Sequence, residues 1–230
     1  MANRYHLQLL ASLFEYPDAD YHDRVGDIKD ILSGRYSDAT AELERFIELL
    51  PVNDLQKMQE LFTRSFDVQA VTTLDVGYVL FGDDYKRGIL LANLNREHRN
   101  ACIDTGTELA DYIPNLLRLM AVIEDEEVLQ DLAYAILAPA LLEMIGEFST
   151  ERIQKRNKSY KKHYKTLIEN APVGDEAVTL YRHALKALYN VLKHDFPRIE
   201  EMPLERKAGS DFLGSVLQED KIEEHTLKQY

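Results

Sequence analysis

The sequence predicts an all-α protein, a single-domain bundle of about eight or nine helices. Apolar residues recur at the i, i+3, i+4 spacing of an amphipathic helix along most of the chain, and no segment sustains the alternation of apolar and polar residues that marks a half-buried strand. A length of 230 residues suffices for one domain with a real core, and 45% hydrophobic with 29% charged residues is the composition of a soluble globular protein.

Turn formers divide the chain into successive helical segments. The breaks fall at residues 16–18, 33–34, 51, 82–83, around 106 and at 172–174. Between them the helical pattern is clearest in three sets of apolar residues. These are Leu43, Phe46, Ile47 and Leu50; Leu116, Leu119, Met120 and Ile123; and Tyr181, Ala184, Leu185, Leu188, Val191 and Leu192.

The later part of the chain has two irregular features. Pro139 lies inside the apolar pattern of residues 128–145, where a proline removes a helical hydrogen bond, so we expect a kink in that helix. After Pro197 the pattern weakens, and prolines and glycines are spaced among charges. We therefore expect a helical domain over residues 1–196 and a loosely held tail over 197–230, in which "DFLGSVL" is a candidate for local docking.

The charge of the chain narrows the range of partners. A formal net charge of −13 and a pI near 5.0 disfavour a nucleic-acid-binding protein, which concentrates Lys and Arg to neutralise phosphates. An acidic surface attracts a basic partner instead. The exception is residues 155–165, "KRNKSYKKHYK", with six basic residues and no acidic one. That stretch fits either a polyanion-binding patch or a solvated helix face whose tyrosines point to the core, and the second interpretation is preferred.

Cysteine usage and the N-terminus indicate a cytoplasmic protein. Cys102 is the one cysteine, which excludes an internal disulfide and a Cys-rich metal site and suits a reducing compartment. The first twenty residues contain a short apolar run, but Gln8 interrupts it and no cleavage site follows. No uninterrupted apolar segment approaches the roughly 20 residues that cross a bilayer, so direct membrane insertion is not expected.

The sequence contains no recognisable motif of catalytic, phosphate-binding or metal-binding residues. None of the seven histidines follows a glutamate at the Glu-x-x-His spacing of carboxylate-bridged metal bundles. Gly77 and Gly82 have the spacing of a phosphate loop, but Asp83 and Asp84 stand where Lys and Ser or Thr are required. Gly-x-Ser-x-Gly is also missing. The sequence therefore predicts a protein that is not an enzyme and that has no metal site and no cofactor of its own.

Residues 72–88, "TTLDVGYVLFGDDYKRG", differ from the amphipathic segments around them. This stretch holds three glycines, three aspartates, two tyrosines and a Lys-Arg pair. Within residues 59–120 it belongs to an ordered series of short motifs. They are Leu61-Phe62, Phe66-Asp67, Thr72-Thr73-Leu74, the run from Gly82 to Gly88 ("GDDYKRG") and the box from Glu108 to Pro114 ("ELADYIP"). "LLASLFEYPD" near the N-terminus and "LAPAL" at 137–141 extend the series, which covers about residues 1–195.

This series resembles the delta-subunit family of respiratory nitrate reductases, the NarJ-type chaperones that assemble molybdoenzymes and are related to the TorD and DmsD groups. The resemblance implies an all-helical cytoplasmic chaperone that binds the N-terminal segment of the molybdopterin-binding catalytic subunit. Such a chaperone keeps that subunit competent for molybdenum cofactor insertion and delays membrane attachment or export. The client is a nitrate reductase or a related nitrite, selenate, chlorate or hydrocarbon-oxidising enzyme.

The resemblance also implies where the client binds. Residues 72–88 would form a helix, a tight turn and the next helix start, and with the 108–114 box they would line one wall of a groove. The candidate client-contacting residues are Tyr78, Gly82, Asp83, Arg87, Glu108, Asp111, Tyr112 and Pro114.

Structural roles compete with client contact at three of these positions. Asp111 either contacts the client or caps a helix over residues 112–123, Arg87 either forms an internal ion pair or binds the client, and Gly82 supplies turn geometry. For the whole protein, the alternatives are an acidic helical adaptor unrelated to molybdoenzymes and a helical metal-binding enzyme.

Overall fold

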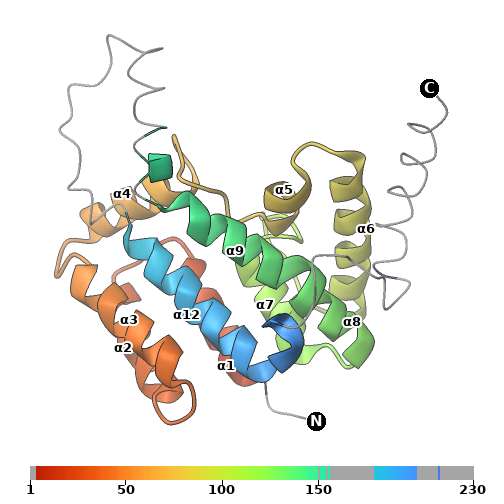
Figure 1. Cartoon of the computed structure of the whole chain (residues 1–230), viewed down its shortest axis with the longest axis horizontal. Coiled ribbons are helices and arrows are strands. Elements are labelled where there is room, and N and C mark those ends of the chain that lie inside the picture. The colour runs from red at the N-terminus through yellow and green to blue at the C-terminus, as the bar shows by residue number, and fades with distance from the viewer. Residues whose placement is uncertain (1–3, 150, 154, 156–178, 201–211, 213–230) are drawn as a thin grey trace. The chain divides into compact units, whose positions relative to one another are not determined.

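The structure is a computed structural model that describes residues 4–149, 151–153, 155, 179–200 and 212. Within those residues the chain forms ten α-helices and no strand (Figure 1). The α-helices are α1 (Tyr5–Ala11), α2 (Tyr21–Leu32), α3 (Ser37–Leu49), α4 (Leu55–Phe66), α5 (Val76–Phe81), α6 (Tyr85–Asn100), α7 (Ile113–Val122), α8 (Glu126–Asp131), α9 (Ala138–Glu147) and α12 (Leu180–Asp195). This confirms the predicted all-α class, but the described part alone has more helices than the eight or nine expected, because short helices such as α5 and α8 have too few residues to give a clear apolar period. Two 3₁₀-helices, η1 (Ser12–Phe14) and η3 (Pro197–Glu200), and a π-helix, η2 (Leu132–Leu137), complete the elements.

The chain contacts group into two compact units. Unit 1 comprises Met1–Phe14, Leu74–Ala140 and Leu192–Tyr230, and unit 2 comprises Glu15–Thr73 and Leu141–Val191. Two of the four boundaries between them fall inside α9 and α12, the other two follow Phe14 and Thr73 outside any α-helix, and neither unit is one continuous stretch of chain. The division of the sequence into a helical domain over 1–196 and a tail over 197–230 stays a prediction.

Unit 1 is built around the packing of α1 against α7. Helix α1 buries Leu7, Leu10 and Ala11, which lie on one face at helical spacing. Helix α7 is apolar on nearly every side and has a proline in its first turn, where the missing N–H costs nothing. Tyr112, the N-cap residue of α7, donates its hydroxyl to the Phe14 carbonyl at 2.9 Å. The start of α7 is therefore tied to the N-terminal segment.

Unit 2 packs α2 against α3 and encloses a cluster of aromatic rings. Tyr181 of α12 lies at the centre of this cluster, with its ring centroid 4.9 Å from that of Phe66. Phe46 and Phe62 contact the same tyrosine ring, and Phe148 contacts Phe66. Edge-to-face and tilted contacts of this kind add to the stabilisation that comes from burial of the rings.

Helices α8 and α9 join through the π-helix η2 into one helical stretch, Glu126–Glu147. Pro139 follows η2 almost directly, and the Ala138 N–H bonds to the Ala133 carbonyl, one residue beyond the α-helical partner. The effect expected of Pro139 therefore takes the form of a π-helical turn. Among the described residues, this is the one helix long and apolar enough to cross a membrane, but 61% of its most apolar window is buried inside the protein.

The other predicted boundaries agree with the structure where residues are described. The breaks at 16–18, 33–34, 51, 82–83 and 106 all separate helices. The break at 172–174 and nearly all of the basic stretch 155–165 lie outside the described residues. Phe212 of the "DFLGSVL" segment is buried, with 2% of its surface exposed. The rest of that segment lies outside the described residues, so its local docking stays a prediction.

Candidate functional site

The two segments singled out by the sequence, 72–88 and 108–114, meet in unit 1. Asp75 and Tyr112 form an isolated antiparallel β-bridge. Beside it, the Val76 N–H donates to the Asp111 carbonyl and the Ile113 N–H donates to the Leu74 carbonyl, each at 3.0 Å. The bridge therefore connects the start of α5 to the start of α7. We call this junction, with the side chains of Asp75, Arg87 and Asp111, the α5–α7 joint.

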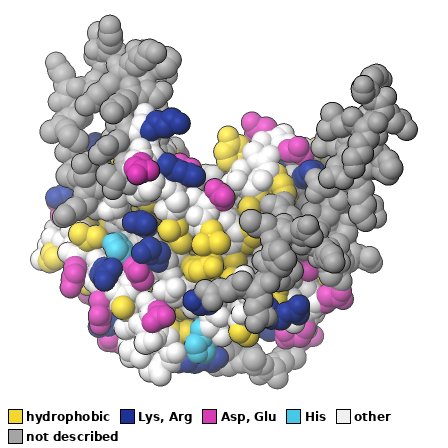
Figure 2. Space-filling view, viewed as in Figure 1, with side chains coloured by type: hydrophobic (Ala, Val, Ile, Leu, Met, Phe, Trp, Pro, Cys, Tyr) yellow, Lys and Arg dark blue, Asp and Glu magenta, His cyan; other side chains and the backbone are white. Residues whose placement is uncertain are grey.

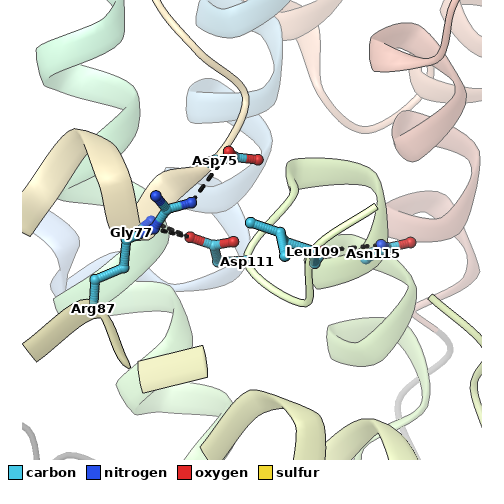
Figure 3. Close-up of polar contacts among 6 residues, drawn as sticks. All are labelled: Asp75, Gly77, Arg87, Leu109, Asp111 and Asn115. Carbon is cyan, nitrogen blue, oxygen red and sulfur yellow. Dashed lines mark hydrogen bonds and ion pairs between the residues drawn. The ribbon is translucent and has the colours of Figure 1, made fainter. Parts of the chain in front are cut away.

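Asp111 is buried at the centre of the joint and is not the cap of the helix that follows it. Helix α7 begins at Ile113 with Tyr112 as its N-cap and without a side-chain cap bond, so Asp111 lies one residue too early to cap it. Its Oδ2 atom instead accepts the Gly77 N–H at 3.1 Å (Figure 3). Gly77 is in the first turn of α5, whose own N-cap residue, Asp75, makes no cap bond. Asp111 thus caps α5 from a distant part of the chain.

The close approach of Asp111 to α5 requires glycine at position 77. A Cβ atom at this position would lie 2.6 Å from the Asp111 Oδ2 atom and 3.2 Å from a Leu90 methyl group. This role was not predicted from the sequence. Its one sequence signal is a glycine at the beginning of a helical segment, where a glycine has no local purpose.

Arg87 links the two aspartates of the joint. From the first turn of α6, its Nε donates to Asp111 Oδ2 at 3.3 Å and its Nη2 donates to Asp75 Oδ2 at 3.2 Å (Figure 3). The internal ion pair predicted for Arg87 is therefore confirmed. The Tyr78 ring covers the guanidinium, with the Arg87 Cζ atom 5.2 Å from the ring centroid, which is cation–π geometry.

The charges in the joint do not balance, because two carboxylates share one guanidinium. Burial raises the pKa of Asp111 and the charge of Asp75 raises it further, while Arg87 acts in the opposite direction. Burial likewise raises the pKa of Asp75 against the opposing effect of Arg87. Within the described part of the chain, the Asp111 Oδ1 atom has no hydrogen-bond partner. The joint thus has two acidic side chains for one basic side chain, and the Asp111 Oδ1 atom is a hydrogen-bond acceptor without a donor among the described residues.

The candidate client-contacting residues divide into buried and exposed groups. Asp111 and Pro114 are buried, and Arg87 and Tyr112 are half-buried. Asp83 and Glu108 are exposed, and Tyr78 exposes 45% of its surface. Gly82 has φ +59° at the end of α5, which confirms its role in turn geometry. The structure therefore brings Tyr78, Arg87, Asp111 and Tyr112 to the joint.

Two residues of the joint's surroundings were not anticipated from the sequence. The Asn115 side chain donates to the Leu109 carbonyl at 3.0 Å (Figure 3). It also donates to the Thr105 carbonyl at 3.1 Å, and so holds the loop that precedes α7. Leu109 exposes 46% of its surface on that loop. Asn115 carries no sequence signal of this role, since its partners are main-chain atoms of residues that could be of any type.

The charged side chains on the described surface are of both signs (Figure 2). Acidic and basic side chains are interspersed over the described face in Figure 2, so this face carries no field of a single sign. No group of three or more His, Cys, Asp or Glu side chains with the spacing of a metal site occurs among the residues that the structure describes. Comparison with protein-family models and with curated proteins finds no match for this chain.

Proposed function

We propose that the protein is an assembly chaperone for a molybdoenzyme. It binds the N-terminal segment of the catalytic subunit and supports molybdenum cofactor insertion and complex assembly before membrane attachment or export. The observation that carries the proposal is the α5–α7 joint, because the two segments with the most distinctive motifs of the resemblance contact each other through Arg87 and Asp111. A joint of this kind gives a reason for both motifs to occur in one chain.

In the proposed mechanism the buried joint positions the exposed residues beside it. Asp111 and Arg87 hold the first turns of α5 and α6, and this fixes Tyr78, whose ring lies over the Arg87 guanidinium. Tyr78 and Leu109 offer apolar surface, and Asp83 and Glu108 offer negative charge. An amphipathic, basic leader segment would bury its apolar face on the first pair and be attracted by the second. Asp111 and Arg87 are then positioning residues.

Titration of a leader peptide tests the proposal. The probe is a synthetic peptide with the sequence of the N-terminal segment of a molybdoenzyme catalytic subunit, titrated into the full chain by calorimetry. We expect saturable binding, weakened about tenfold by Tyr78→Ala because an exposed aromatic anchor contributes on the order of 1–2 kcal/mol. Tyr85→Ala is the matched control, since Tyr85 is also an exposed tyrosine but is not one of the residues that define the joint.

The outcomes separate the chaperone from its alternatives. Leader binding that Tyr78→Ala does not weaken would show that the joint is not part of the client site. No binding of the leader, together with binding of unrelated basic peptides, would favour a general acidic adaptor. Stoichiometric iron, manganese or zinc in the purified protein would favour a metal-binding enzyme.

A further inference from the structure

His98 is a buried histidine that links two helices of unit 1. It lies in the last turn of α6, and 2% of its surface is exposed. Its Nδ1 atom lies 2.8 Å from the Leu94 carbonyl oxygen, one turn earlier in the same helix. Its Nε2 atom lies 3.2 Å from the carbonyl oxygen of Asn115, in the first turn of α7. The ring therefore connects the end of α6 to the beginning of α7.

Both partners of the His98 ring are carbonyl oxygens, which accept hydrogen bonds and cannot donate them. A neutral imidazole has one N–H group, and its other ring nitrogen is itself an acceptor, so it can bind only one of the two carbonyls. An imidazolium has two N–H groups and donates to both. The two contacts together therefore fit the protonated ring.

The charges around the ring act in both directions. His98 lies at the C-terminal end of α6, where the helix dipole favours a cation. Arg99, exposed beside it, and Arg118, half-buried on α7, are cations and act against a further positive charge. The ring forms no ion pair with a carboxylate in the described part of the chain. Of the titratable side chains on the loop between α6 and α7, three are exposed and one is bound in the joint: Cys102, Asp104 and Glu108, and Asp111.

We propose that His98 is a proton-dependent latch, which binds both helices as an imidazolium and releases α7 when it loses a proton. The Leu94 contact is the shorter one and lies within α6, so the Asn115 contact is the one lost. The Asn115 side chain also donates to the carbonyls of Leu109 (Figure 3) and Thr105. The residue that the latch holds is thus the residue that positions the loop before α7, and deprotonation loosens that loop.

The latch itself is independent of the proposed function, but its effect on client binding rests on that function. Leu109, on the loop, exposes 46% of its surface and is part of the apolar surface proposed to receive the leader. A loosened loop no longer holds Leu109 in one position, and a surface that is less preorganised binds more weakly. Leader binding should therefore be stronger at mildly acidic pH than at alkaline pH.

NMR spectra of the ring nitrogens, recorded on the full chain with ¹⁵N-labelled histidine, test the latch directly. At pH 7 a free imidazole is mostly neutral, whereas we expect His98 to carry a proton on both ring nitrogens. Its signal is the one lost in His98→Gln. Should that variant fail to fold, it is the signal that survives in single variants of each of the other histidines. One protonated and one unprotonated ring nitrogen at pH 7 would overturn the proposal.

Urea titrations provide a second test, because a proton that the folded chain holds more firmly than the unfolded chain makes stability fall as pH rises. Relative to His98→Gln, which does not titrate, the unfolding equilibrium constant of the parent should increase about 10-fold between pH 6 and pH 9. That factor is the scale of one hydrogen bond to a charged group. A difference between the two chains that stays constant with pH would also overturn the latch.

His22→Gln is the matched control for these titrations. His22, on α2, is half-buried and forms no hydrogen bond or ion pair with any described residue. Its substitution should leave the pH dependence of the parent unchanged. The same loss of pH dependence in His22→Gln as in His98→Gln would show that the effect does not come from the latch.

Titration of the leader peptide at pH 6 and pH 8.5 measures the effect on the client. We expect the parent to bind about 3-fold more weakly at the higher pH, and His98→Gln to bind equally at both. A pH dependence of His98→Gln equal to that of the parent would overturn the link between the latch and the client. Absence of leader binding to either chain would refute the proposed function, while the ring-nitrogen spectra still decide the latch.

Discussion

The α5–α7 joint depends on the absence of a Cβ atom at Gly77. Because its Cβ would lie 2.6 Å from Asp111 Oδ2, Gly77→Ala forces the carboxylate away from both of its donors. We expect a loss of roughly 1–3 kcal/mol in the free energy of unfolding, measured by denaturant titration. Gly88→Ala is the control: nothing lies within 4 Å of its Cβ position in α6, so it should stabilise by roughly 0.5–1 kcal/mol. A Gly77→Ala variant as stable as the parent would contradict the joint.

Asp111 makes a prediction about pH whose sign follows from the direction of its pKa shift. A carboxyl whose pKa is raised by folding binds more protons in the folded state, so its contribution to stability decreases as pH rises above its ordinary value of 3.8. Asp111→Asn does not titrate. Relative to the parent, the variant should therefore become more stable as pH is raised from about 3 toward neutrality, as measured by urea titrations at several pH values. A variant that instead becomes less stable relative to the parent as pH rises would mean that Arg87 lowers the pKa of Asp111 more than burial raises it.

Cys102 occupies a backbone conformation that favours glycine. It follows the end of α6 with φ +55°, and the next residue's N–H, that of Ile103, closes on the His98 carbonyl at 2.9 Å, as in a Schellman motif. Cys102→Gly should raise the free energy of unfolding by roughly 0.5–1 kcal/mol, because it relieves the left-handed strain at an exposed position. Cys102→Ser keeps the strain and should change the free energy of unfolding little. Thermal melts of the parent and both variants measure these effects. A destabilised glycine variant would show that the cysteine side chain has contacts that matter.

At the scale of elements, Glu42 ties α3 to α12 within unit 2. Its carboxylate accepts from His183 Nδ1 at 2.6 Å and from Lys186 Nζ at 3.3 Å. Burial acts to raise the pKa of Glu42, but the His183 hydrogen bond and the Lys186 charge together hold it below its ordinary value of 4.5. The stabilisation is therefore complete above pH 4.5 and is lost as pH falls through the lowered pKa.

Glu42→Gln should remove that pH-dependent link. We expect a loss of about 1–2 kcal/mol at neutral pH, the scale of hydrogen bonds to a charged group, and a smaller loss at pH 3. Urea titrations at the two pH values measure both. Glu48→Gln, on the same helix but exposed, should change stability by less than about 0.5 kcal/mol. An equal loss at both pH values would show that Glu42 acts through packing alone.

At the scale of the whole molecule, the net charge of −13 bears on how fast a basic partner associates. Stopped-flow measurements with the leader peptide should show association slowing markedly as ionic strength rises, while dissociation changes little, because salt screens long-range steering more than close contacts. An uncharged analogue of the peptide should associate at a rate independent of salt. Salt-independent association of the basic leader itself would eliminate steering and leave burial as the source of binding.

The sequence by itself determined the helical class, five of the breaks between helices and part of the core. The three apolar sets around 43–50, 116–123 and 181–192 lie in α3, α7 and α12 or at the residue directly after the helix, and all their members except Ile47 are buried. The turn formers mark helix ends wherever the structure describes them. These features are local, because helical periodicity and turn chemistry are properties of neighbouring residues. The internal pair of Arg87 was anticipated only as one of two possibilities, since its partners could not be identified from spacing.

The tertiary structure alone decided what Asp111, Gly77 and Asn115 do. Asp111 precedes a helix in the sequence, which favours a cap for that helix, yet it caps α5 because the β-bridge between Asp75 and Tyr112 brings it there. Gly77 accommodates a side chain 34 residues away. In the same way, the Phe212 carbonyl accepts a hydrogen bond from the Asn93 amide on α6, 119 residues away in the chain. Contacts between residues so far apart in the chain leave no local periodicity, so only the folded structure reveals them.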